Sequence, residues 1–87
     1  MTNQADSVVG LARLYGDLQT GRSKRLRQAA RLTQADVARA VGASRCAVAS
    51  WEDGRRRPKG DQASQYGAFL ESLAKALQQQ NGAGASN

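Results

Sequence analysis

The fold is decided by residues 32–54, LTQADVARAVGASRCAVASWEDG, in which Gly42 separates two short helices. Thr33 can cap the first helix, and Asp36 three residues later completes a weak capping box. Gly42 tolerates the left-handed conformation that ends many helices. Ser44 can cap the second helix, which is expected to run to about residue 53, before another glycine. Local signals alone therefore predict two helices joined by a tight turn.

The inward and outward faces of these helices follow from the helical period. Val37, Ala38 and Val41 are expected to face inward, and Ala38 is small enough for the two helices to cross closely. Val48 and Trp51 lie three residues apart on the second helix, and we expect them in the core rather than stacked on a ligand. The other side of that helix is left free to meet a partner, and it carries Arg45, Cys46, Ala49 and Ser50.

Three more helices are expected around this segment. Steps of three and four between apolar residues indicate a helix over 8–18, carrying Val8, Leu11, Tyr15 and Leu18. Another is expected over 22–31. A long helix from residue 61 has an apolar seam of Ala63, Tyr66, Leu70, Leu73 and Leu77. With no strand pattern, the sequence predicts an all-α, compact bundle of about five helices.

The domain organisation follows from these elements. Residues 1–20 are expected to form an accessory helix and a candidate dimer contact, and residues 21–59 are expected to form the helix-turn-helix core. Residues 60–80 form a C-terminal helix for packing or dimerisation, and the polar, glycine-rich residues 81–87 are expected to be a disordered tail.

Positive charge is concentrated in the middle of the chain. The 87 residues carry a net charge of +6, but residues 21–60 hold eleven Arg or Lys against three carboxylates, a local net charge of +8. Each flanking segment carries a net charge of −1. Because ten of the thirteen basic residues are Arg, which suits bidentate phosphate binding, this distribution favours a nucleic-acid partner over a merely solvated surface.

Composition excludes several classes of function. One Cys and no His rule out a zinc site within one chain, an intrachain disulfide and histidine-based catalysis. No motif suggests an enzyme, so neither catalysis nor a cofactor is expected. No apolar run is long enough to span a membrane and no secretory signal opens the sequence, so a cytoplasmic protein is expected. Four aromatic residues give no stacking platform for RNA.

Residues 23–58 resemble the Cro/Xre-type repressors of phages, plasmids and bacteria, with looser similarity to about residue 77. The resemblance is carried by Leu26-Arg27, Leu32-Thr33-Gln34, Asp36-Val37-Ala38, Val41-Gly42, Ser44-Arg45, Trp51-Glu52-Asp53-Gly54-Arg55 and Pro58. It implies a lambda-repressor-like domain that binds double-stranded DNA as a dimer and represses transcription.

The resemblance also implies roles for individual residues. Arg45, Cys46 and Ser50 match base-reading positions, and Ala49 would meet a thymine methyl or act as a spacer. Gln34 matches a phosphate-binding position, and the capping residue Ser44 is a further candidate for phosphate.

Other assignments concern phosphate contacts and structure. Arg55, Arg56 and Arg57 directly follow the second helix of the motif, so phosphates are their expected partners. Arg27 and Glu52 match a buried ion pair of the family.

Each assignment has a plainer alternative. Arg45 could contact phosphate instead of a base, and Gln34 could be an ordinary exposed residue at a helix start. Cys46 could be a small residue at the interface edge or a redox-sensitive contact. Arg27 and Glu52 could be two exposed charges, and the three consecutive arginines could be a solvated loop.

The apolar faces outside the motif are expected to set the dimer. The Val8/Leu11/Tyr15/Leu18 face is predicted to pack on the seam of the C-terminal helix, within one chain or between two. Phe69 and Leu73 are the candidates for subunit contact.

The sequence therefore predicts a repressor acting as a homodimer on an inverted-repeat operator. The alternative is an antitoxin-like or other protein-binding module, whose C-terminal helix engages a partner protein and whose DNA binding serves autoregulation.

Overall fold

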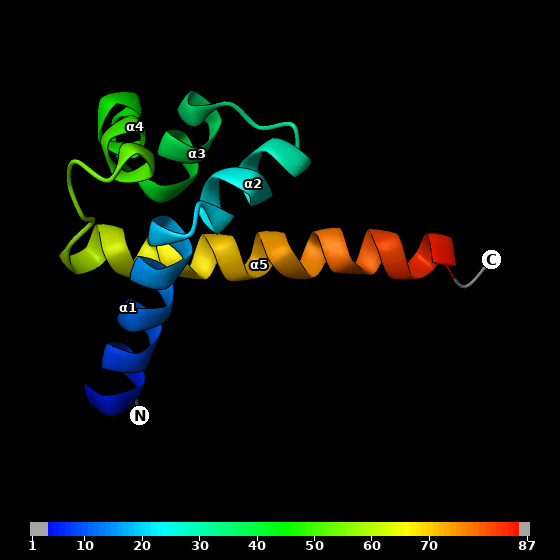
Figure 1. Ribbon diagram of the computed structural model, residues 1–87, viewed down its shortest axis with the longest axis horizontal. Helices are drawn as coiled ribbons and strands as arrows, with labels where there is room; N and C mark the ends of the chain where they lie inside the picture. Colours follow the sequence, from blue (N-terminus) through cyan, green and yellow to red (C-terminus); the bar gives the residue numbers. More distant parts are fainter. Residues whose placement is uncertain (1–3, 86–87) are drawn as a thin grey trace.

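The computed structural model describes residues 4–85, which fold into five helices and no strand (Figure 1). The helices are α1 (Gln4–Gln19), α2 (Arg22–Ala29), α3 (Gln34–Val41), α4 (Arg45–Asp53) and α5 (Gly60–Ala85). The all-α bundle predicted from the sequence is confirmed.

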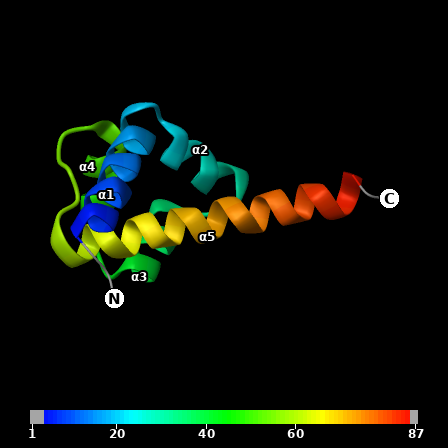
Figure 2. The ribbon, with the colours of Figure 1, turned by 90° about the horizontal axis from the view of Figure 1, so that it is seen from below.

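The long helix α5 is the element on which the others are arranged. Helices α2 and α3 pack against its first half, α3 packs in turn on α4, and α1 packs on both α2 and α5. The C-terminal half of α5 projects beyond the other helices in both views (Figures 1 and 2). The motif helices therefore pack near the beginning of α5 and not on its projecting half.

The core lies where α3, α4 and the first half of α5 meet. Trp51 and Tyr66 are both buried, and their ring centroids are 5.0 Å apart. Burial raises the pKa of Tyr66 to about 12. The inward residues predicted for the motif are all buried. Among the described side chains, the core is formed by Leu14, Val37, Ala38, Val41, Val48, Trp51, Ala63, Tyr66 and Leu70. Each large side chain among them contributes about 1.5–3 kcal/mol by leaving water.

The second helix is shorter than predicted. Instead of reaching residue 31, α2 ends at Ala29, and Arg31 takes a left-handed conformation with φ of 61°. The Arg31 N–H donates to the Gln28 carbonyl, and the Leu32 N–H donates to the Arg27 carbonyl, each at 3.0 Å. These bonds satisfy carbonyls that the helix end would leave without donors, so the turn is stable although no glycine marks it.

The packing face of α1 also differs from the prediction. Among the side chains described for α1, those from residue 8 on, Leu14 is the buried one, while Tyr15 and Leu18 are half-buried. Val8 and Leu11 are 63% and 36% exposed within the chain. The physical reason is that α1 crosses α5 rather than running alongside it, so its first turns lie away from the other helices (Figure 1).

Most of the seam predicted for the C-terminal helix packs within the chain. Ala63, Tyr66 and Leu70 are buried, and Phe69, Leu73 and Leu77 are half-buried. The disordered tail predicted for residues 81–87 stays a prediction, because residues 86 and 87 lie outside the described residues and only the backbone is described for 81–85.

Candidate nucleic-acid interface

Helix α4 is held by one side and open on the other. Val48 has no exposed surface and Trp51 is 3% exposed, so this side is fixed in the core. On the opposite side Arg45 and Cys46 are exposed, and Ala49 and Ser50 one turn later are half-buried. The four residues predicted to read bases thus lie along one face of a helix whose rotation about its axis is fixed by packing.

The turn between α3 and α4 has the local structure that the sequence predicts. Gly42 has a φ of 72°, which places it in the left-handed region, and the N–H of the next residue donates to the Ala38 carbonyl at 2.9 Å. Ala38 is 3% exposed where the helices pack closely. The Ser44 hydroxyl accepts a bond of 3.0 Å from the Ala47 N–H and so caps α4.

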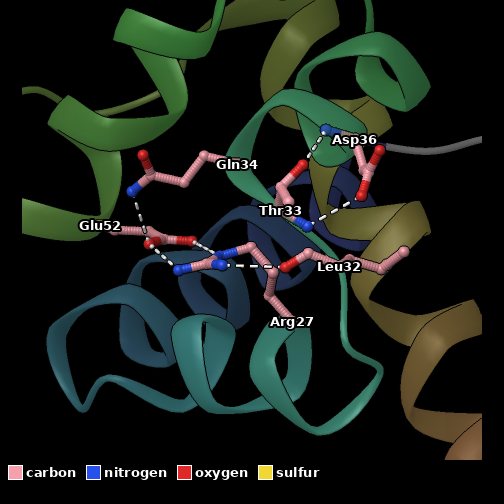
Figure 3. A network of polar contacts seen from close by, with 6 residues as sticks. All are labelled: Arg27, Leu32, Thr33, Gln34, Asp36 and Glu52. Carbon is pink, nitrogen blue, oxygen red and sulfur yellow. Dashed lines mark hydrogen bonds and ion pairs between the residues drawn. The ribbon is translucent and has the colours of Figure 1, made fainter.

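The start of α3 is fixed by a reciprocal capping box. The Asp36 N–H donates to the Thr33 hydroxyl at 3.0 Å, and the Thr33 N–H donates to the Asp36 carboxylate at 2.9 Å (Figure 3). Hydrogen bonding of the Asp36 carboxylate to the backbone of Thr33, and next to its side chain, holds the pKa of Asp36 below its ordinary value. These interactions define where α3 begins.

A polar network joins α2, α3 and the end of α4 (Figure 3). Arg27 donates to both carboxylate oxygens of Glu52, from Nε at 2.7 Å and from Nη2 at 3.0 Å. Its Nη1 donates to the Leu32 carbonyl at 2.9 Å. The side chains of Arg27 and Glu52 are only 12% and 2% exposed. The hydrogen bond to Glu52 raises the pKa of Arg27, so the guanidinium remains charged.

Gln34 is the fourth member of this network. Its Nε2 donates to Glu52 Oε1 at 3.1 Å. Because an ionised carboxylate only accepts hydrogen bonds, the amide nitrogen of Gln34 must face Glu52. One amide hydrogen is therefore engaged, and the second hydrogen and the amide oxygen are left for other partners. This contact was not predicted from the sequence, because only the tertiary fold brings residues 34 and 52 together.

The three arginines after α4 form an exposed loop beside the motif. Gly54 ends α4 with a φ of 79°, and the N–H groups of Arg55 and Arg56 both donate to the Ser50 carbonyl, at 3.0 and 3.4 Å. The side chains of Arg55, Arg56 and Arg57 are exposed. The loop is thus folded back on the last turn of the helix that carries the outward face.

The charges of this region are unevenly compensated. Arg55 lies 4.0 Å from Asp53. Within the part of the chain that the structure describes, Arg45, Arg56 and Arg57 form no ion pair, and no three potential metal ligands cluster. The outward face and the loop therefore present positive charge that is free to meet an anionic partner.

Comparison with known protein families gives a match over most of the chain. A protein-family model described as a helix-turn-helix domain matches residues 24–83, which include nearly all of α2 to α5 and leave α1 outside. No curated protein and no solved structure matches the chain. No helix between residues 4 and 85 combines the length and apolar character needed to cross a membrane.

Proposed function

The chain belongs to the helix-turn-helix domain family, and from this premise we propose that it is a transcriptional repressor that inserts α4 into the major groove of DNA. The observation that carries the proposal is the asymmetry of α4. One side is anchored in the core by Val48 and Trp51. The other side exposes Arg45 and Cys46, and Arg45 forms no ion pair among the described residues.

Arg45 is the residue to which we assign base recognition. Its position in the first turn of α4 suits a side chain that reaches the groove floor, and no carboxylate neutralises it among the described residues. A bidentate contact with guanine O6 and N7 is worth about 1–3 kcal/mol of discrimination. Cys46, Ala49 and Ser50 share this face and would complete the base contacts.

Phosphate contacts are assigned to the edges of the same face. Arg55, Arg56 and Arg57 lie at one end of α4, and Ser44 lies at the other. Gln34 would contribute its second amide hydrogen, because Glu52 uses only one. Each neutralised phosphate is expected to add about 0.9 to the slope of log affinity against log salt concentration.

We propose that the repressor acts in the cytoplasm as a homodimer on an inverted repeat. The proposal is supported by apolar surface that one chain leaves open: Val8 and Val9 are 63% and 58% exposed. A hollow of about 610 Å³ between α1 and α5 lies next to them, with Gly10 and Gly67 in its lining. Together with the projecting half of α5, these features suit a second copy of the chain.

The oligomeric state separates this proposal from the protein-binding alternative. Sedimentation of the purified chain should give a dimer, and Val8→Glu should shift it toward monomer without unfolding it, because Val8 is exposed. A monomer at all accessible concentrations that binds DNA without symmetry would instead favour a module whose C-terminal helix engages another protein.

Selection from a random DNA pool at about physiological salt tests the DNA-binding function. We expect an enriched inverted repeat with half-sites about one helical turn apart. Arg45→Ala should relax selection at one base position in each half-site, whereas the control Arg56→Ala should weaken binding to all sequences equally. Equal losses for both variants, or the absence of any enriched sequence, would contradict the proposal.

A further inference from the structure

Helix α1 lies outside the range matched by the family model, yet it contacts the basic loop that follows α4. We infer that Tyr15 of α1 is a positioning residue, which holds Arg57 in an orientation ready to bind a DNA phosphate. This inference rests on the proposed DNA-binding function.

Tyr15 contacts two consecutive residues of the loop in different ways. Its hydroxyl donates to the Pro58 carbonyl at 3.2 Å, and Pro58 is fully buried. The face of its ring lies under the Arg57 guanidinium, with the Arg57 Cζ atom 4.8 Å from the ring centroid. One contact fixes the backbone at the end of the loop, and the other restricts the side chain just before it.

The geometry of the stack leaves Arg57 competent to bind an anion. A cation–π contact uses the flat face of the guanidinium, whereas its N–H donors point outward in the plane of the group. Arg57 remains exposed, so a phosphate can approach the edge of the group while the face stays on the ring. The ring orients the Arg57 cation but leaves its charge intact. A carboxylate in the same place would neutralise that charge.

The stack also distinguishes Arg57 from the two arginines before it. Arg55 Nε lies 4.0 Å from Asp53 Oδ2, so a phosphate must compete with that carboxylate for the Arg55 guanidinium. Among the described residues, Arg56 has neither a carboxylate partner nor a cation–π contact. Arg57 alone of the three combines full charge with a restricted side chain, so it loses less conformational freedom when it binds phosphate.

A double-mutant cycle on the full chain tests the inference. Tyr15→Leu should weaken binding to DNA of any sequence about two- to tenfold, the factor expected when the freed Arg57 side chain must be ordered on binding. In the Arg57→Ala background, Tyr15→Leu should cost almost nothing more. In the matched Arg55→Ala background it should cost the full factor. Tyr15→Phe, which keeps the ring and removes the hydroxyl, should retain most of the affinity.

A measurement without DNA gives an independent readout. The NMR resonance of the Arg57 Nε–H should carry a ring-current shift that Tyr15→Leu removes and Tyr15→Phe keeps. Thermal unfolding of each variant establishes that it is folded at the temperature of the binding assay.

The outcomes separate this inference from the proposed function. Additive losses for Tyr15→Leu and Arg57→Ala, or an Arg57 resonance indifferent to Tyr15→Leu, overturn the positioning role even if the protein binds DNA as proposed. A parent protein that binds no DNA overturns the proposed function, and the role assigned to Tyr15 falls with it.

Discussion

Removal of the Glu52 carboxylate is the most informative perturbation of the fold. In Glu52→Leu, the Arg27 guanidinium would remain charged with its side chain only 12% exposed, and it would lose both bonds to the carboxylate. Gln34 would lose one bond as well, but its half-exposed amide can turn to water. We expect the free energy of unfolding to fall by about 3–5 kcal/mol, the cost of leaving a buried charge uncompensated.

A fall of this size should be easily measured in so small a domain. For 60–100 residues, each kcal/mol lowers Tm by roughly 4–8 °C, so Tm should drop by at least about 12 °C. Urea denaturation followed by Trp51 fluorescence gives the free energy directly, because Trp51 is the one tryptophan of the chain and lies in the core.

Two further variants identify burial as the cause. Arg27→Leu combined with Glu52→Leu leaves no buried charge and should recover most of the loss. Glu71→Leu removes a salt bridge of similar length, in which Arg13 Nη1 lies 2.9 Å from Glu71 Oε1. The side chains of Arg13 and Glu71 are 62% and 61% exposed. This control should change stability by at most about 1 kcal/mol. A Glu52→Leu loss below about 1 kcal/mol, or a double variant as unstable as the single one, would refute the reasoning.

Three other predictions concern titration and backbone conformation. Because burial raises the pKa of Tyr66 from 10.0 to about 12, stability should be intact below pH 10 and fall by roughly 3 kcal/mol as the pH rises to about 12. Urea denaturation at several pH values checks this, and an unchanged profile in Tyr66→Phe would contradict it. The capping bonds from Thr33 lower the pKa of Asp36, so the stability it adds should be present above pH 3.8 and lost as the pH falls through the lower pKa of the folded state. An NMR titration should show this lowered pKa, and Thr33→Ala should return it toward its ordinary value. Gly42→Ala should cost about 1–2 kcal/mol because of its positive φ, whereas Gly16→Ala, with open space around it inside α1, should stabilise by about 0.5–1 kcal/mol. Equal thermal shifts for the two alanine variants would show that the left-handed conformation is not the cause.

The motif was predictable from sequence because its signals are local. Each signal involves residues no more than four positions apart in the chain. They are the capping box of Thr33 with Asp36, the left-handed conformation of Gly42 and the capping bond of Ser44. The apolar positions of α3 and α4 needed only the helical period. The end of α2 was not predictable in this way, since Arg31 adopts a left-handed conformation that arginine rarely takes and that no sequence signal marks.

The sequence by itself thus determined the helices of the motif, which face of α4 is outward, and where positive charge is concentrated. The tertiary structure alone decided which residue of α1 is buried, because neighbouring positions such as Leu14 and Tyr15 fit similar stripes and only the crossing with α5 selects Leu14. It also decided that Gln34 faces Glu52 and that Arg57 stacks on Tyr15. These contacts join residues 18 and 42 positions apart, and their geometry depends on how whole helices pack, which no local pattern encodes.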